Sequence, residues 1–375
     1  MKNKILVLST GLAMFSMFFG SGNLVFPILV GKMAEGHFGL ASLGILLTGV
    51  VVPFLGILAM LLFNGNSNEF FSRLGKPALF WFPLIALSLM GPFGVLARCI
   101  TVAHGAFRLI FADTPLWAFS IVTCAALFFL AIRKNRIVPI LGTLLTPLLL
   151  LSLAAIVWFA IEGNSIPTES VVSGWGSLKE GLLQGYQTMD LLAAFFFSAF
   201  IIRHLREKNQ GLPTFFKAAL IGASLLAAIY FSLVLLGAMY APMLHQVPPQ
   251  EMFGFIAQKA LGSAAVPIVC TAVILACMTT AVVLTSLFAD FFRKEVVKDK
   301  ISPSLSLVIT LGIACLVSTL EFSGIAKILG PLMEIMYPAL ITLTLCNIAF
   351  KLWGWKQLKM PTAIAVVLKL ISSAI

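Results

Sequence analysis

The stretch GSGN at 20–23 could bind a small charged solute directly through its backbone. It interrupts the apolar run 5–31 with two glycines, a serine and an asparagine. Non-helical backbone survives at membrane depth only where protein buries it or where it lines a water-filled cavity. The carbonyls and amides freed at such a break can hold an ion or a zwitterion. A tight packing seam of small residues is the alternative interpretation.

A buried carboxylate is the second feature with chemical potential. Asp190 stands near the middle of the apolar segment 181–202, directly after Thr188 and Met189 in the sequence GYQTMD. An ionised group at that depth is costly and by default marks a functional site. The glycine and polar residues that precede Asp190 also weaken the helix, so we predict a second interrupted helix here.

Oxygen donors in a third segment could hold a cation. Ala276, Thr279 and Thr280 lie on one face of the segment 264–290, because positions i, i+3 and i+4 coincide on a helix. Two hydroxyls and a carbonyl are hard donors, and carbonyls freed near Ser16 and Phe19 could complete a small cation site. The alternative is that both threonines bond back to carbonyls of their own helix.

Two further ionisable residues in apolar segments are candidate gating residues. Arg98 follows MGPFGVLA, one or two turns from the end of its segment. Its side chain could reach the membrane interface, or it could face the cavity and attract a carboxylate. Glu334 lies in PLMEIMYP and could act as a gate or as a pairing residue.

These residues lie in an integral membrane protein. Of the 375 residues, 60% are hydrophobic and only 10% are charged, whereas about 25% are charged in a typical soluble domain. Apolar runs of about 20 residues recur along the chain, each long enough to cross a bilayer. Alternating strand patterns are absent, which indicates an all-α bundle and not an outer-membrane barrel.

Ten membrane helices are predicted. Their approximate limits are 5–31, 38–63, 77–103, 116–132, 137–161, 181–202, 214–240, 264–290, 302–320 and 328–350. Between the second and third, Phe70, Phe71 and Leu74 predict a short interfacial helix. The final segment, 361–375, is too short for a comfortable span, so the eleventh helix is expected to be truncated.

The basic residues predict the orientation of the chain. The N-terminus and every second loop carry 18 Lys and Arg residues, and the opposite loops carry 5. This bias predicts a cytoplasmic N-terminus and a location in the bacterial inner membrane. It also accounts for the net charge of +11 and argues against binding to nucleic acid.

Interrupted helices at positions one and six run in opposite directions, as a five-plus-five inverted repeat requires. The predicted division is a first repeat at 1–161, a second at 162–350, and a cytoplasmic loop with the partial eleventh segment at 351–375. This arrangement would also bring the segment 264–290 beside the first break.

The sequence carries no enzyme signature. A nucleophile elbow, a P-loop, an HExxH motif and paired Asp-rich motifs are all missing from it. Its six cysteines show no metal-binding spacing. No cofactor is expected, and without an ATP site any uphill transport would have to run on an ion gradient.

Five segments of the chain resemble the bacterial branched-chain amino acid:cation symporter family. They are FGSGNLVFPILVG at 19–31, MGPFGVLAR at 90–98, GYQTMD at 185–190, ACMTTAVVLT at 276–285 and MEIMYPAL at 333–340. The resemblance covers nearly the whole chain in order. It implies a leucine-transporter-like fold and the carriage of leucine, isoleucine and valine with sodium or, in some members, protons.

The resemblance also implies roles for matching positions. The substrate's amino and carboxyl groups would bind at the first break, at Gly20, Ser21, Gly22 and Asn23. The second break, at Thr188, Met189 and Asp190, would complete the pocket. Sodium would bind to Ser16, Phe19, Ala276, Thr279 and Thr280. From their apolar character, we expect residues such as Phe26, Met189 or Phe195 to form the pocket for the aliphatic side chain of the substrate.

The sequence therefore predicts a sodium-coupled importer of branched-chain amino acids that works by alternating access. One alternative is a proton-coupled carrier on the same fold, with Asp190 as the proton acceptor. Another is a passive facilitator or channel, which would not accumulate its substrate. A membrane enzyme is a more distant alternative, since no catalytic constellation is present.

Overall fold

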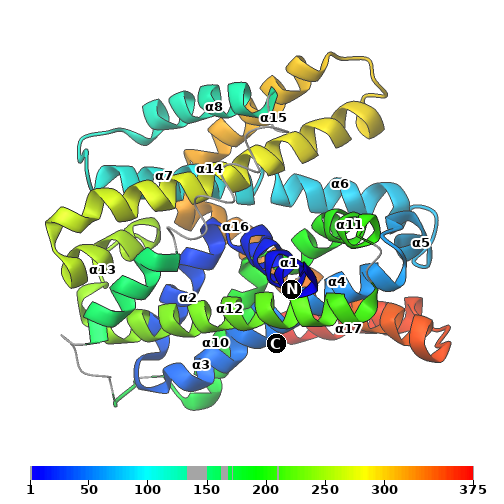
Figure 1. The fold of residues 1–375 in the computed structure, drawn as a ribbon, viewed down its shortest axis with the longest axis horizontal. Helices are drawn as coiled ribbons and strands as arrows, with labels where there is room; N and C mark the ends of the chain where they lie inside the picture. The colour runs from blue at the N-terminus through cyan, green and yellow to red at the C-terminus, as the bar shows by residue number, and fades with distance from the viewer. Residues whose placement is uncertain (1, 133–149, 162–167, 171, 209–210, 375) are drawn as a thin grey trace.

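The computed structural model describes residues 2–132, 150–161, 168–170, 172–208 and 211–374, and this part of the chain is helical without strands (Figure 1). The α-helices are α1 (Lys2–Phe18), α2 (Ser21–Ala34), α3 (Phe38–Leu46), α4 (Val52–Leu62), α5 (Ser67–Ser72), α6 (Ala78–Met90), α7 (Val95–Arg108), α8 (Leu116–Ile132), α10 (Gly174–Gln187), α11 (Asp190–Glu207), α12 (Leu212–Met239), α13 (Met252–Leu261), α14 (Val266–Phe291), α15 (Pro303–Ser318), α16 (Glu321–Trp353) and α17 (Lys359–Ala374). A further apolar helix covers Leu150–Ile161.

The predicted spans overlap these helices wherever the structure describes them, although some limits differ. Five long apolar segments, some of them built from consecutive helices, have the length and composition needed to cross a membrane: Ser21–Leu62, Ala78–Arg108, Leu212–Met239, Val266–Val296 and Glu321–Trp353. Shorter apolar helices account for the other spans. The part of the predicted fifth span at 137–149 lies outside the described residues, and the limits of the two predicted repeats stay a prediction.

The third predicted span is not one continuous helix, contrary to the sequence-based expectation. Helices α6 and α7 are separated by a turn at 91–94, which has the sequence GPFG. Pro92 has no amide hydrogen to continue a helical ladder. A side chain on Gly94 would overlap the carbonyl of Leu89, so the turn requires glycine there. The sixth span also differs from its prediction, because its first helix begins at Gly174.

The helices form two groups around the interrupted segments (Figure 1). In the first group, α14 packs on α7, α8 and α15. In the second group, α12 packs along α1 and α2, α10 packs on α3, and α11 packs on α4. Helix α16 contacts members of both groups and carries α17 along its side. The breaks between α1 and α2 and between α10 and α11 therefore lie within the second group, and α2 also touches α7 of the first.

Glycines allow the helices of the second group to approach very closely. A side chain on Gly237 of α12 would overlap the carbonyl of Ile28 on α2, and one on Gly31 would overlap the carbonyl of Val234. The same holds for Gly181 of α10, whose missing side chain leaves room for the backbone of α3. Small residues at such crossings are typical of packed membrane helices, because dispersion contacts replace the hydrophobic effect there.

The short helix α5 exists as predicted, but its aromatic residues do not face a membrane interface. Phe70 and Phe71 are buried, with ring centroids 5.3 and 5.7 Å from that of Phe195 on α11. Phe82 of α6 joins the cluster at 5.9 Å from the Phe195 ring. The cluster anchors the loop between the second and third spans to the protein. Phe195 therefore packs against other aromatic rings and does not line the pocket, contrary to its predicted contact with the substrate.

The residue after α5 ties this loop to the end of α16. Arg73 Nη1 donates to Asn347 Oδ1 at 2.6 Å, Nη2 donates to the carbonyl of Lys356 at 3.2 Å, and the guanidinium lies 3.9 Å from the centroid of the Phe350 ring. We expect Arg73→Ala to lower the free energy of unfolding by about 2 kcal/mol, because charge-assisted bonds are lost and their acceptors are left unpaired.

Thermal unfolding of the purified protein in detergent measures this effect. Lys76→Ala is the matched control, since Lys76 is an exposed cation in the same loop. Equal melting temperatures for the two variants would contradict the anchoring role of Arg73.

Candidate functional site

The first predicted break is present and is held open by a side chain. Helix α1 ends at Phe18 and α2 begins at Ser21. The amide of Gly20 donates to Asn23 Oδ1 at 3.1 Å. In a continuous helix that amide would donate to the carbonyl of Ser16, four residues earlier. The Asn23 side chain thus accepts the hydrogen bond that the carbonyl of Ser16 would otherwise accept. The last carbonyls of α1 are left available at the break.

The second predicted break is also present, and an unusual backbone conformation marks it. Met189, between α10 and α11, has φ 59° and ψ 20°, in the left-handed region that non-glycine residues seldom adopt. The Thr188 hydroxyl donates to the carbonyl of Gly185 at 2.9 Å and helps to end α10. Asp190 is the first residue of α11, where the helix dipole favours a negative charge.

Hydrogen bonds join the two breaks through Asp190. Asn23 Nδ2 donates to Asp190 Oδ2 at 2.7 Å, and the Tyr230 hydroxyl donates to the same oxygen at 2.9 Å. Asn23 Nδ2 also bonds to the Tyr230 hydroxyl. All three side chains are buried, and Asp190 is only 3% exposed. The network therefore couples α2, α11 and α12 at one buried carboxylate.

Tyr230 is a site residue that the sequence reasoning missed. It lies in the middle of α12, in the sequence AAIYFS, and is one of only four tyrosines in the chain. A hydroxyl within an otherwise apolar span needs a polar partner, and this signal could have linked Tyr230 with Asp190. Its ring also packs over Gly49, where a side chain would approach within 2.8 Å of the ring.

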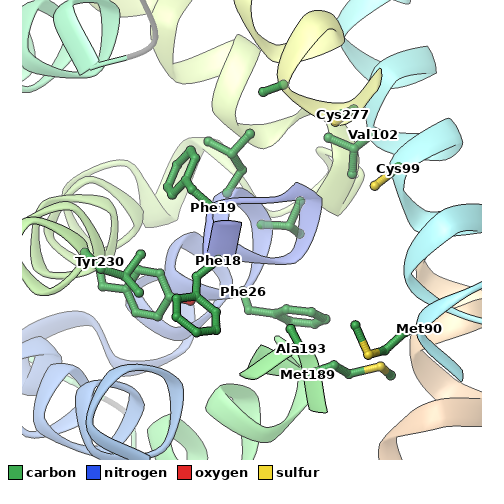
Figure 2. Close-up of a cluster of buried hydrophobic side chains, with 14 of the residues drawn as sticks. Phe18, Phe19, Phe26, Met90, Cys99, Val102, Met189, Ala193, Tyr230 and Cys277 are labelled. Carbon is green, nitrogen blue, oxygen red and sulfur yellow. The ribbon is translucent and has the colours of Figure 1, made fainter. Parts of the chain in front are cut away.

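A pocket lies between the two breaks and the facing helices. Its lining consists of Phe18, Gly20, Gly22, Asn23, Met90, Val95, Arg98, Thr188, Met189, Asp190, Ala193, Phe197, Thr280 and Leu284. Figure 2 shows part of this environment, with Met90 and Met189 lying close to one another. The structure thus brings most of the predicted substrate residues together with Arg98 and Thr280.

Four residues of the pocket lining lie on one side of the helix breaks. Phe18 closes the end of α1, Ala193 and Phe197 lie on the first turns of α11, and Leu284 lies one turn beyond Thr280 on α14. These residues lie on the side of the breaks from which the N-terminal helix enters. On the opposite side, the stacked rings of Tyr186 and Tyr337 lie beyond the second break, 4.9 Å apart.

Arg98 is part of the pocket lining. It is 1% exposed, so its side chain does not reach an interface. Nη1 donates to the carbonyl of Gln187 at 2.8 Å, and Nη2 donates to Gln187 Oε1 at 2.9 Å. The guanidinium carbon lies 5.0 Å from the Phe26 ring centroid and 5.6 Å from that of Phe322. Phe26 thus packs against Arg98.

The predicted cation ligands are divided between two helices near the first break. On α14, the Thr279 and Thr280 hydroxyls donate to the carbonyl of Ala276 at 2.8 and 3.3 Å, which is the back-bonding that membrane threonines commonly show. A side chain on Gly20 would lie 3.6 Å from Thr280 Oγ1, so α14 passes directly beside the break. Ser16 donates its hydroxyl to the carbonyl of Ala13 at 3.1 Å.

Two predicted residues have partners outside the pocket lining. The Ser21 hydroxyl lies 3.3 Å from Cys99 Sγ on α7, and Figure 2 shows Cys277 of α14 close to Cys99. Glu334 forms an ion pair with Lys369, with 2.9 Å between Oε2 and Nζ, and this pair joins α16 to α17. A gating role for Glu334 stays a prediction.

The sequence is similar to known transport proteins over almost its full length. A family model described as branched-chain amino acid transport protein matches residues 2–374. The branched-chain amino acid permease BrnQ of Corynebacterium glutamicum is 31% identical over 350 residues, which make up 91% of this chain and 80% of that protein. BrnQ of Bacillus subtilis is 30% identical over 366 residues, with coverage of 92% and 82%.

Solved structures show a similar arrangement of helices. The inward-facing conformation of Mhp1 superposes with a TM-score of 0.66 at 13% identity, covering 98% of this chain and 89% of that one. MhsT in complex with L-phenylalanine gives a TM-score of 0.62 at 16% identity, with coverage of 97% and 98%. These likenesses confirm the predicted leucine-transporter-like fold.

These relatives are named as permeases, so the prediction that the chain is not an enzyme is confirmed. The match to the family model runs from residue 2 to residue 374, so it includes both helix breaks, helix α14 and helix α17. This chain therefore belongs to the branched-chain amino acid transport protein family, a family of multi-pass membrane transporters.

Proposed function

We propose that the protein imports leucine, isoleucine and valine together with Na⁺ by alternating access. The observation that carries this proposal is the buried carboxylate of Asp190, which is hydrogen-bonded to Asn23 so that two interrupted helices meet in one pocket. Interrupted helices around a polar centre at membrane depth are the usual substrate site of secondary transporters. The names of the relatives supply the class of substrate.

In this mechanism the substrate lies between the two breaks. Its ammonium group meets Asp190 and the carbonyls at the end of α1, and its carboxylate meets the amides at the start of α2. The aliphatic side chain contacts apolar residues of the pocket such as Met189 and Ala193. One methylene changes binding by about 1–3 kcal/mol in an apolar pocket, so the three branched-chain amino acids compete.

The coupling ion binds between α1 and α14. Its ligands are carbonyls of Ser16, Phe19 and Ala276 and the hydroxyls of Thr279 and Thr280. Binding draws α14 onto the break and orders Gly20 and its neighbours for the substrate. This ordering gives the positive linkage between ion and amino acid that a symporter needs.

Phe18, Ala193, Phe197 and Leu284 of the pocket lining lie on the side of the breaks from which the N-terminal helix enters, and the positive-inside bias makes that side cytoplasmic. In the bacterial inner membrane, this conformation would release substrate to the cell interior. The inverted repeats at 1–161 and 162–350 would supply the second, outward-facing conformation by exchanging their arrangements.

A proton-coupled carrier on the same fold is the second candidate. It is favoured by one observation, the burial of the Asp190 carboxyl group, which is only 3% exposed. Uptake of radiolabelled leucine into proteoliposomes distinguishes the two. Accumulation driven by an inward Na⁺ gradient, with the pH gradient collapsed, supports sodium coupling. Accumulation driven only by a proton gradient supports the second candidate, and equilibration without accumulation supports a passive facilitator.

Thr280→Ala tests the assignment of the ion site. Loss of one hydroxyl ligand is expected to raise the Na⁺ concentration for half-maximal uptake about tenfold, the effect of removing about 1.4 kcal/mol of binding. Thr271→Ala is the matched control, because Thr271 makes the same back-bond on α14, to Pro267 at 2.6 Å, on an exposed face. An unchanged Na⁺ dependence in Thr280→Ala would remove this hydroxyl from the ion site.

A further inference from the structure

Two opposite charges line the pocket without neutralising each other. Among the described lining residues, Arg98 is the one cation and Asp190 the one anion. Both side chains are buried, at 1% and 3% exposure. The ion pairs formed by the described residues involve neither of them. Buried charges without counter-charges are strongly unfavourable, so a ligand that brings both signs would relieve the cost at both ends.

The guanidinium of Arg98 is only partly used by the protein. Gln187 occupies the end of the fork, where Nη1 and Nη2 donate to its backbone and side-chain oxygens. Both acceptors are neutral. The Nε atom is buried and has no hydrogen-bond partner among the described residues. An arginine presents a second two-donor edge through Nε, and a carboxylate matches such an edge with two parallel hydrogen bonds.

The surroundings of Arg98 hold this group in place for an anion. Phe26 of α2 and Phe322 of α16 lie near the guanidinium, and the backbone of Gly22 faces Phe26 and Thr188, which would lie 3.4 and 3.5 Å from a side-chain carbon at that position. Since Gly22 lies in the first turn of α2, its amide belongs to the positive end of that helix. Amides and guanidinium therefore border the same part of the pocket.

We propose that Arg98 binds the carboxylate of the transported amino acid through its Nε edge, while Asp190 binds the ammonium group. This inference rests on the proposed transport of amino acids and specifies how the zwitterion is oriented. The carboxylate lies between α7 and the start of α2, and the ammonium lies at the start of α11. Arg98 thus selects for α-carboxylates and is more than a gate or a cap on the end of α10.

The alternative is a purely structural role, in which Arg98 serves only to bind the last carbonyl of α10. Equilibrium binding to the purified protein separates the two roles with a pair of ligands. Leucine carries the carboxylate, and leucinamide replaces it with a neutral amide and keeps the ammonium group. We expect the native protein to prefer leucine by about 30-fold or more, the effect of breaking a buried charge-assisted contact.

In Arg98→Gln, the ratio of the two affinities should fall close to one, because the group that distinguishes the ligands is gone. Gln187→Ala is the control for the structural contact, and we expect it to keep the native ratio even if both affinities fall. Arg98→Lys serves where the first variant does not fold. It keeps the charge and loses the two-donor edge, so its ratio should lie between those of the native protein and Arg98→Gln.

Two results would overturn the inference. One is a native protein that binds leucine and leucinamide equally. The other is an Arg98→Gln or Arg98→Lys variant that weakens both ligands by the same factor. Both are distinct from failure of the proposed function, in which the native protein would bind no branched-chain amino acid at all.

Discussion

Asp190→Asn is expected to reduce leucine uptake by about 100-fold or more, because the ammonium group of the substrate loses its only buried counter-charge in the pocket lining. The substitution keeps the shape of the side chain, and its remaining carbonyl oxygen can still accept the hydrogen bonds from Asn23 and Tyr230. The loss should therefore come from charge and not from misfolding.

The same variant should not be less stable than the native protein. Burial of an uncompensated carboxylate is costly, so its removal is expected to leave the melting temperature in detergent unchanged or raised. Asp113→Asn is the matched control, since Asp113 is exposed in the loop after α7 and should retain native uptake. Native uptake by Asp190→Asn would exclude Asp190 from substrate binding and from proton coupling alike.

Gly237→Leu is expected to have the largest effect on folding, because it disrupts the packing of α12 on α2. A first side-chain carbon at this position would already overlap the carbonyl of Ile28, which is backbone and cannot rotate away. Helix α12 would have to move away from α2 and from the adjoining break. Overpacking of a core commonly costs about 1–3 kcal/mol, and a clash with backbone lies at or above that range. We expect little folded protein in size-exclusion chromatography and no leucine uptake.

Gly312→Leu supplies the matched control for this prediction. Gly312 also lies within a membrane helix, α15, but a side chain there would meet nothing within 4 Å. Both variants replace a helical glycine with leucine. They differ in that Gly237 faces the backbone of another helix and Gly312 faces no other atom within 4 Å. Equal yields of folded protein would show that α12 and α2 do not approach as closely as described.

The overall fold could be predicted from the sequence because its signals are local. Each apolar run is long enough to cross a membrane, and the glycines and polar residues at 20–23 and 185–190 weaken a helix through their own backbone preferences. The sequence does not predict the interruption at 91–94, because GPFG lies within an otherwise apolar run. Pro92 between two glycines was the available signal, and it has the same physical basis as the breaks that were found.

The site was less predictable because its contacts join distant segments. Asn23 and Asp190 were identified, but the bond between them spans 167 residues, and the partner Tyr230 lies 207 residues from Asn23. Gln187 was recognised only as a helix-weakening residue, since nothing local shows that Arg98 donates to it. Phe195 was assigned to the substrate pocket on its apolar character, which cannot distinguish a pocket wall from the aromatic cluster around Phe70.

The central claim is that ion and amino acid bind together at the first helix break. Leucine affinity of the purified native protein, measured in Na⁺ and in choline at equal ionic strength and pH, tests it most directly. We expect Na⁺ to raise the affinity for leucine about 5- to 150-fold, and leucine to raise the affinity for Na⁺ by the same factor, as linkage requires. Equal leucine affinity in the two salts would contradict an ion site beside the break.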